Sequence, residues 1–518
     1  MRDFTARVAA APPLHVALAP MLPLLIFYRR GASGATPVSI VWPAVVLLLT
    51  SLAVWGVLTL LGRNARKAGL ASSVLMLAGC GYYLAVDLAR AAGANLLVLA
   101  LYALVPLALV PIWRARPDAI ARATRWANVG LLAVTVVLAG LAVRDELRVQ
   151  RVAAADAPAP VAGPAASNER ARPDIYVLVL EGYARQDVLR TYYGFESELP
   201  ARLRGLGFFV ADRAAGNYAQ MGQAMAAALN MEYLHDLVRG GGDAVPLRRR
   251  LGELITRNRF FAALADAGYD ITSYESEYAF LRPGPVHSRP APLVRFTNFE
   301  YRWYEATVLP RLFQTVGMPR SVVPMAVRAR HIHWLLDRVG GEPADEDRPR
   351  FVFAHLLMPH PPFAVAADGR LRATRIAAGF NDGDQWTDLA RGTGERYEDG
   401  YADAVKFLDA RIPGVVNRIL GRTKPAIVYV LSSHGPASRL RWESPDATGV
   451  RERLASLLAV RFPDGAHAPL HARTTPVNAF RALLNRAIQT DLPMLEDRSY
   501  FSTWERLHEY RDVTSLVQ

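Results

Sequence analysis

The chain has 518 residues, more than one ordinary domain, so we expect at least two folded units. Its hydrophobic share of 52% is concentrated in residues 1–147, which predicts a transmembrane domain followed by a soluble part. The formal charge of +13 could suit nucleic acid, but no Lys/Arg tract with interleaved aromatic residues is present, so nucleic acid is not an expected partner. Cys80 is the only cysteine, which excludes an intramolecular disulfide and a thiolate metal cluster.

Five apolar blocks stand in the first part of the chain. They cover residues 14–28, 38–61, 70–89, 95–113 and 126–143. A helix needs about 20 mostly apolar residues to cross a bilayer, and the second and fourth blocks meet this length well. No small-residue cleavage site with a mature soluble chain follows the first block, so it is not expected to be a signal peptide. We therefore predict about five transmembrane helices.

The basic residues between the blocks predict which side of the membrane each loop faces. Nine of them precede block one or lie in the loops after blocks two and four: Arg2, Arg7, Arg63, Arg66, Lys67, Arg114, Arg116, Arg122 and Arg125. Only Arg29, Arg30 and Arg90 lie in the other loops. By the positive-inside rule the amino terminus is cytoplasmic, and five crossings place everything after residue 143 outside the cytoplasm.

The membrane part is joined to the rest by residues 148–171, which we predict to be a linker. Residues 153–166 read AAADAPAPVAGPAA, and this Ala/Pro-rich composition is typical of an extended, semi-rigid spacer. Residues 172–518 then form the predicted extracytoplasmic domain.

This domain alternates strand-like and helix-like segments. Short apolar runs at 175–180, 351–358 and 426–431 predict strands buried on both faces, and 205–212 and 268–276 predict two more. Residues 220–237, 247–267 and 401–420 predict helices, the last bent at Pro413. Such alternation favours an α/β fold with a mostly parallel sheet flanked by helices.

Polar residues stand where the buried strands end. Glu181 closes the first run, Ser433 and His434 follow the last, and His355 and His360 belong to the middle one. Ligands of open α/β sheets bind outside the carboxyl ends of the strands. If these ends converge, a carboxylate and up to three imidazoles supply the ligands for a divalent metal. Spacing alone leaves open whether they do, or whether the side chains are structural.

Five colinear motifs carry a resemblance. They are PDIYVLVLEGYAR (173–185), NYAQMGQAMAAALNMEYL (217–234), HLLMPHPPF (355–363), VYVLSSHGP (428–436) and TTPVNAFRALLNRAIQTDLPMLEDRSYF (474–501). Together they resemble the sulfatase-like hydrolases and transferases of the alkaline phosphatase superfamily, whose relatives include lipoteichoic acid synthases and lipid A phosphoethanolamine transferases. The resemblance implies a multi-pass protein of the bacterial cytoplasmic (inner) membrane with an extracytoplasmic catalytic domain.

The resemblance also assigns roles to single residues. Glu181 matches the family's first metal ligand, and Met221 stands at the position of its Thr or Ser nucleophile, at a helix amino terminus. Ser433 and His434 match the Asp-His pair of ligands. His355 and His360 match a segment near the substrate head group.

Two of these matches depart from the family in ways that bear on catalysis. The thioether of Met221 has no proton to lose and attacks phosphorus poorly. Ser433 removes an anionic ligand, so Glu181 and His434 would hold Mn, Zn, Mg or Ca with less charge than such cations prefer. We therefore favour a site with no catalytic residue and at most a weak or vestigial metal.

Three interpretations compete. The favoured one is a membrane-anchored pseudoenzyme that binds an envelope lipid or glycan head group, or a membrane partner; the helix beginning near Met221 could still attract an anion. The alternative is an active phosphotransferase or sulfuric-ester or phosphodiester hydrolase that uses Ser432, Ser433 or a metal-activated water. A purely structural role in envelope assembly has no positive support in the sequence.

Overall fold

The computed structural model of the chain divides into two compact units. It describes residues 13–30, 35–94, 96–155, 159–161, 172–238, 244–278, 280–281, 284, 287–289, 296–318, 321–342, 348–372, 374, 376, 380–422 and 425–517. The first unit comprises Met1–Arg151 and Phe299–Arg320, and the second comprises Val152–Asn298 and Ser321–Gln518. The chain therefore returns to the first unit once, through residues 299–320. Of the predicted linker at 148–171, residues 148–155 are helical, which corrects its predicted start, and residues 156–158 and 162–171 lie outside the described residues.

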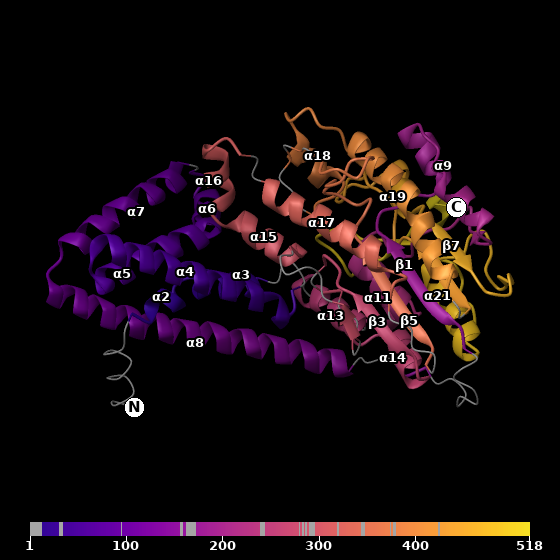
Figure 1. Cartoon of the computed structure of the whole chain (residues 1–518), viewed down its shortest axis with the longest axis horizontal. Helices are drawn as coiled ribbons and strands as arrows, with labels where there is room; N and C mark the ends of the chain where they lie inside the picture. The colour runs from indigo at the N-terminus through magenta and orange to yellow at the C-terminus, as the bar shows by residue number, and fades with distance from the viewer. Residues whose placement is uncertain are drawn as a thin grey trace. The chain divides into compact units, whose positions relative to one another are not determined.

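The first unit is helical (Figure 1). Its helices are α2 (His15–Leu18), α3 (Met21–Arg29), η1 (Pro37–Ile40), α4 (Val41–Gly62), α5 (Ala65–Cys80), α6 (Tyr82–Ala91), α7 (Leu96–Arg114), α8 (Pro117–Ala155), α15 (Asn298–Ala306) and α16 (Leu309–Thr315). Within the described residues, Pro37–Gly62 and Pro117–Val152 are long and apolar enough to cross a membrane. If α5 and α6, which meet at a bend of 54° at Gly81, cross the membrane together as one span, the number of such spans is three. The shorter apolar helices His15–Arg29 and Ala100–Arg114 correspond to blocks one and four, so all five apolar blocks are helical.

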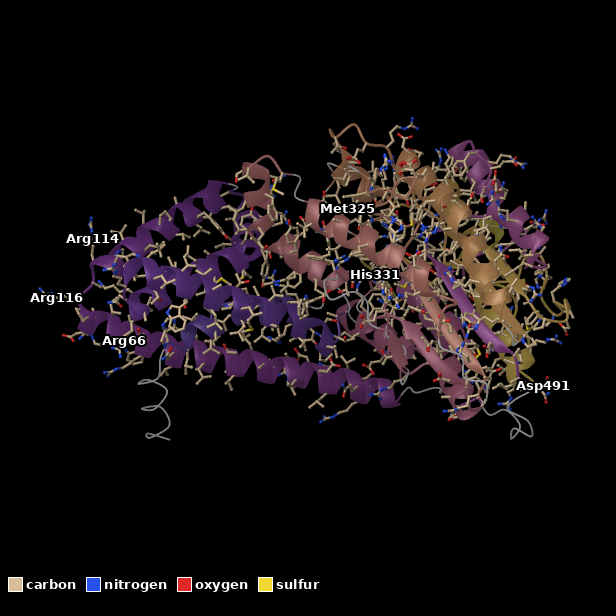
Figure 2. The ribbon with its side chains drawn as sticks, in the orientation of Figure 1. Arg66, Arg114, Arg116, Met325, His331 and Asp491 are labelled. Atoms are coloured by element: carbon tan, nitrogen blue, oxygen red, sulfur yellow. The ribbon has the colours of Figure 1, made fainter. Side chains whose placement is uncertain are left out.

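Polar contacts show which helix ends lie together in the first unit. Arg29 pairs with Asp145 at 3.0 Å and Arg30 with Asp87 at 2.5 Å, which joins the ends of α3, α6 and the apolar stretch of α8. The Nζ of Lys67 donates to the carbonyl of Trp113 at 2.8 Å, which joins the α4–α5 turn to the end of α7. Figure 2 shows Arg66, Arg114 and Arg116 gathered at this second end. The helices therefore alternate in direction as the loop charges predict.

The second unit is built on a seven-stranded sheet in the order β2-β7-β6-β1-β5-β3-β4. The strands are β1 (Asp174–Leu180), β2 (Phe209–Val210), β3 (Asp270–Tyr274), β4 (His287–Arg289), β5 (Arg350–Leu356), β6 (Ala426–Leu431) and β7 (Leu458–Arg461). All pairs among β6, β1, β5, β3 and β4 are parallel, and β7 runs antiparallel to β6 and β2. The predicted mostly parallel α/β sheet is confirmed. A separate ribbon pairs β8 (Tyr500–Phe501) with β9 (Arg511–Asp512).

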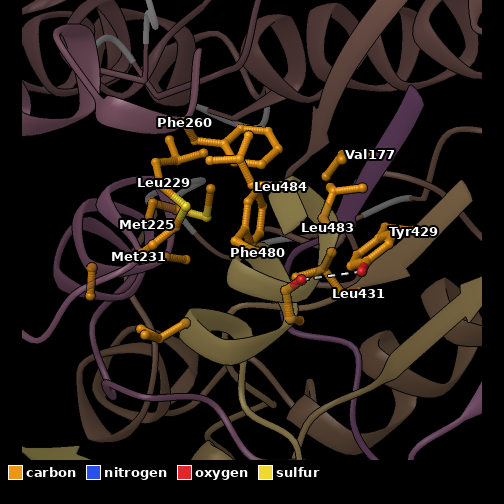
Figure 3. Packing of buried hydrophobic residues seen from close by; sticks show 14 of the residues in the cluster. Val177, Met225, Leu229, Met231, Phe260, Tyr429, Leu431, Phe480, Leu483 and Leu484 are labelled. Carbon is orange, nitrogen blue, oxygen red and sulfur yellow. Dashed lines mark hydrogen bonds between the residues drawn. The ribbon is translucent and has the colours of Figure 1, made fainter. Parts of the chain in front are cut away.

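Helices cover both faces of this sheet (Figure 1). Side chains alternate along a strand, so Val177 and Val179 of β1 face one core while Leu178 and Leu180 face the other. The first core is formed with α11 (Met221–Asn230), α13 (Ala244–Thr256), α14 (Arg259–Asp266) and α21 (Pro476–Ile488). Figure 3 shows Phe260, Phe480 and Leu484 packed together in this core. The hydroxyl of Tyr429 donates a hydrogen bond to the carbonyl of Ala479 in α21. The second core is formed with α17 (Val322–Arg338) and α19 (Tyr397–Leu420).

Local details differ from the sequence pattern in two places. The predicted single helix at 247–267 is two helices, α13 and α14, because Asn258 caps the second: its side chain accepts from the amide of Phe261 at 2.8 Å. The predicted single helix at 220–237 is also two helices, because α11 ends at Asn230 and Met231 adopts a left-handed φ of +57° before α12 begins at Leu234. After β1 the chain forms α9 (Gln186–Val188) and a one-turn π-helix, η3 (Leu189–Tyr193). The remaining helices are α10 (Leu199–Gly205), α12 (Leu234–Leu237), α18 (Asp384–Ala390), α20 (Ala447–Leu454) and α22 (Thr514–Val517).

Candidate functional site

The predicted site residues meet at the carboxyl edge of the parallel strands. Glu181 directly follows β1, His355 lies near the end of β5, and Ser433 and His434 follow β6. Parallel strands end at the same edge, and the antiparallel β7 begins there. Strand topology therefore brings together residues that are more than 250 positions apart in the sequence.

Glu181 is the centre of this cluster. Its Oε1 lies 2.7 Å from Nε2 of His434 and accepts a hydrogen bond from the hydroxyl of Ser433 at 2.5 Å. Its Oε2 lies 2.9 Å from Nε2 of His355. Glu181 and His434, whose convergence the sequence left open, are therefore in direct contact. Burial alone would raise the pKa of this fully buried carboxyl, but the charge and hydrogen bonds of His434 and His355 hold it well below its usual range.

Hydrogen bonds orient the two imidazoles that flank the carboxylate. The hydroxyl of Ser276 accepts from the amide of Tyr278 and lies 2.9 Å from Nδ1 of His355. It can donate its own proton to that nitrogen, which leaves Nε2 of His355 to donate to Glu181. On the other side, Nδ1 of His434 lies 2.8 Å from the carbonyl of Gly435, which can only accept. Nε2 of His434 therefore serves both other neighbours of the ring, Oε1 of Glu181 at 2.7 Å and Nη2 of Arg453 at 3.0 Å.

A buried guanidinium occupies the space beside that nitrogen. Nη2 of Arg453 lies 3.0 Å from Nε2 of His434, and Nη1 donates to Oδ2 of Asp382 at 2.6 Å. The same guanidinium donates to the carbonyls of Ala219 (2.7 Å) and Gly435 (3.2 Å). It also lies 5.3 Å from the centre of the Trp442 ring. Arg453 is 3% exposed, so this cation is part of the interior of the site.

Arg453 and Asp382 were not predicted from the sequence. Arg453 lies in the last turn of α20 and Asp382 in a loop before α18, and neither belongs to a recognisable motif. Their partnership spans 71 positions, which no local pattern encodes. Burial opposes ionisation of Asp382, but the charges of His360 and Arg453 lower its pKa.

His360 belongs to the same cluster at greater distance. Its ring centre is 6.0 Å from that of His434, its Nε2 is 3.4 Å from Oδ2 of Asp382, and its Nδ1 is 2.6 Å from the carbonyl of Pro361. Burial lowers the pKa of His360 to about 4. His355 and His360, the predicted head-group contacts, are both buried, with their ring nitrogens directed at groups of the protein itself.

Ser432, one of the alternative nucleophiles, holds the turn after β6. Its hydroxyl accepts from the amides of Gly182 and Tyr183 and donates to the carbonyl of His434 at 2.5 Å. Gly182 has φ +89°, and a Cβ there would stand 3.2 Å from the amide nitrogen of His360. A side chain at 182 is therefore disfavoured both by backbone conformation and by this close approach.

Met221 is the first residue of α11, the helix-start position that the resemblance implies. Its side chain is 5% exposed and belongs to the hydrophobic core cluster. The carbonyl of Ala219, two residues earlier, accepts from Arg453, so the chain before Met221 is adjacent to the Glu181–His434 cluster. No oxygen nucleophile stands at this helix start.

The residues present do not fit the divalent metal that the resembled family uses. Both oxygens of Glu181 are engaged, Ser433 is neutral, and Nε2 of His434 already contacts both Glu181 and the Arg453 guanidinium. A dication bound to that nitrogen would stand next to a fixed positive charge, which is repulsive in a buried site. Among the described residues there is no group of three or more His, Cys, Asp or Glu that could hold a metal ion.

A second buried contact between a carboxyl group and a guanidinium adjoins the cluster. Glu277 follows Ser276 and pairs with Nη1 of Arg328 at 3.1 Å, while Nη2 of Arg328 donates to the carbonyls of Leu357 and His360. A cavity of about 10 Å³, lined in part by Ser276, Glu277 and Arg328, lies beside them and has room for about one water. Burial outweighs Arg328 and raises the pKa of Glu277 to about 7.

We expect Glu277→Gln to flatten the pH dependence of stability. A carboxyl whose pKa rises from 4.5 to about 7 on folding keeps its proton in the folded chain, so stability falls as pH rises between these values. Between pH 5 and 8 the stability difference between the two proteins should change by about 3 kcal/mol, an order of magnitude from the shift. Denaturation of both at several pH values measures it, with the exposed Glu496→Gln as control. Parallel curves would show that Glu277 is ionised throughout.

Comparisons with known proteins find similar solved structures only. The full-length lipooligosaccharide phosphoethanolamine transferase A of Neisseria meningitidis is 13% identical with a TM-score of 0.40, over 92% of this chain and 85% of that one. The soluble domain of that transferase is 13% identical with a TM-score of 0.39, over 64% of this chain and 92% of that one. A putative sulfatase of Bacteroides thetaiotaomicron is 10% identical with a TM-score of 0.41, over 65% of this chain and 79% of that one. No family model and no curated protein matches the chain. Likenesses this remote do not bear on the chemistry of the site.

Proposed function

We propose that this chain is a membrane-anchored protein of the bacterial cell envelope that keeps a sulfatase-like fold without its catalysis. It acts by binding an envelope lipid or glycan head group or a membrane partner. The observation that carries the proposal is the 3.0 Å contact between Nη2 of Arg453 and Nε2 of His434. A fixed organic cation stands where a catalytic metal would need a free nitrogen.

Two substitutions support the loss of turnover. Met221 offers no ionisable oxygen at the start of α11, and the Ser433 hydroxyl is committed to Glu181. Phosphoryl or sulfuryl transfer needs both an activated nucleophile and positive charge on the transferred group. No residue at the start of α11 can serve as the activated nucleophile.

Binding of an anionic head group is the role that the remaining groups support. Arg453 supplies positive charge, and the first turn of α11 has no side-chain cap on its amides. The ring of Tyr278 stands beside the cluster, with its centre 6.1 Å from that of His355 and 6.5 Å from that of His360.

The test is a turnover assay on the purified full-length protein. With manganese, zinc, magnesium or calcium supplied, we expect no hydrolysis of generic phosphodiester or sulfate-ester substrates. Inorganic phosphate or sulfate should raise the thermal midpoint of the protein, and Arg453→Lys should reduce this shift. Robust turnover that Glu181→Ala or His434→Ala abolishes would refute the proposal and favour the active enzyme.

We also propose that the second unit is extracytoplasmic and the membrane is the bacterial inner membrane. The loop-charge bias supports this sidedness, and the contacts that gather the basic helix ends agree with it. A reporter fused after Ala166 should therefore be active only outside the cytoplasm, and one fused between Arg114 and Arg125 only inside it. Exchanged signals would overturn this orientation.

A further inference from the structure

The segment that returns to the first unit carries a surface that the proposed function does not use. Residues 299–320 contain nearly all of α15 and the whole of α16, and they pack with the apolar helices rather than with the sheet. The amide of Val308, between the two helices, donates to the carbonyl of Gly79 in α5 at 2.9 Å. The connection is therefore made by the backbone of an apolar helix.

Aromatic side chains reinforce this attachment. The ring of Phe27 in α3 lies 5.7 Å from Phe299 and 5.4 Å from Trp303, and Tyr83 of α6 lies 6.4 Å from Trp303. Phe299, Trp303 and Tyr83 are buried, so these rings hold residues 299–303 against α3 and α6 within the first unit.

The position of the Val308–Gly79 contact along α5 indicates its depth in the membrane. Helix α5 begins at Ala65, at the same end of the helical unit as the contact between Lys67 and Trp113. Gly79 lies 14 residues further along this helix. At 1.5 Å per residue it stands about 21 Å from that end, against a hydrocarbon thickness of about 30 Å. Val308 thus reaches α5 in the part of the bilayer nearer to the Arg30–Asp87 pair.

The helix after Val308 has one apolar face. At 100° per residue, Leu309, Leu312, Phe313 and Val316 fall within an arc of about 100°, while Arg311, Gln314 and Thr315 fall on the other side. Leu309 is 48% exposed, Leu312 51% and Val316 70%. About half or more of the surface of each of these three side chains is exposed, whereas Pro310 in the same helix is buried.

We propose that α16 lies in the plane of the membrane surface, with Leu309, Leu312 and Val316 immersed in the lipid and Arg311 and Gln314 facing water and head groups. The lipid is the occupant that fits, because Val308, directly before the apolar face, is hydrogen-bonded to Gly79 of the apolar helix α5, and the rings of the preceding helix pack against α3 and α6. Residues 299–320 are thereby attached to the membrane in addition to the spanning helices.

Site-directed labelling of the full-length protein in phospholipid nanodiscs tests this orientation. In a Cys80→Ala background, which removes the only native thiol, Leu312→Cys, Val316→Cys and the matched control Gln314→Cys each receive an environment-sensitive fluorophore. Labels at 312 and 316 should emit at shorter wavelength and be quenched by brominated lipid. The label at 314 should be quenched by aqueous iodide instead.

Each other outcome overturns the proposal. Iodide quenching of equal strength at all three positions would place α16 in water. Lipid quenching at all three would mean that the helix is inserted rather than lying in the plane. Protection of 312 and 316 from both quenchers would mean that protein, rather than lipid, covers the face. Leu309→Cys provides a second reporter of the same face if Val316→Cys fails to fold.

Discussion

Replacing Glu181 by alanine is expected to lower the free energy of unfolding of the second unit by about 3–5 kcal/mol. The carboxylate accepts from Ser433 and lies against His355 and His434 in a site where none of the four is more than 1% exposed. Its removal leaves two imidazoles and a hydroxyl without their acceptor in the interior. Chemical denaturation of the full chain in detergent, monitored by far-ultraviolet circular dichroism, measures the loss.

The pH dependence of this loss has a defined sign. The pKa of Glu181 is lowered on folding, so its contribution is fully present above its unfolded value near 4.5 and is lost only as pH falls through the folded value. The gap between wild type and Glu181→Ala should therefore be constant near neutral pH and close only in acid. Asp388→Ala is the control, because its pair with Arg391 is exposed and should contribute less than about 1 kcal/mol. A loss no larger than that of the control would contradict the buried cluster.

Arg453→Met is expected to cost about 3–5 kcal/mol as well. It leaves Asp382 buried without its nearest cation and removes the donors to the carbonyls of Ala219 and Gly435. Arg453→Lys keeps the charge but not the planar fork, so we expect an intermediate loss. Because the guanidinium lies over the ring of Trp442, tryptophan fluorescence of the folded chain should change in both variants.

The chain provides a matched control for this prediction. Arg451 lies in the same helix, α20, and pairs with Asp187, but its side chain is 45% exposed. Arg451→Met should therefore change stability by no more than about 1 kcal/mol. Equal losses for Arg451→Met and Arg453→Met would show that helix propensity, rather than the buried contacts of Arg453, sets the effect.

The buried strands were predictable because both of their faces are apolar. The run at 175–180 corresponds to β1 and the run at 426–431 to β6, and the parallel order of the sheet agrees with their alternation with helices. The cluster of Glu181 and His434 was predictable because the residues after parallel strands all emerge at one edge of the sheet. The prediction that Glu181 and His434 hold a weakly bound metal is untested, and the contact of His434 with Arg453 argues against it.

The return of residues 299–320 to the membrane unit was not predictable. The segment contains Arg302, Glu305 and Arg311, so it lacks the long apolar run by which spanning helices are recognised. Its membrane character lies in one face of a seven-residue helix and in ring contacts with Phe27 and Tyr83, both more than 200 positions away. Amphipathic faces this short are not distinguishable from surface helices by sequence pattern alone.

The role of Arg453 was hidden for a related reason. Its four polar partners come from the chain before α11, the loop before α18 and the turn after β6. A basic residue in the last turn of a helix is ordinarily a solvated partner of the helix dipole. Only the folded chain shows that this one is buried between an aspartate and a histidine.

The metal content of the purified full-length protein tests the central claim most directly. After incubation with zinc or manganese and removal of unbound ions, elemental analysis should find no stoichiometric metal whose binding depends on Glu181 or His434. His434→Ala should leave the metal content unchanged, because Arg453 already supplies the positive charge at that nitrogen. One metal ion per chain in the wild type, lost in both Glu181→Ala and His434→Ala, would contradict a non-catalytic site built around a fixed guanidinium.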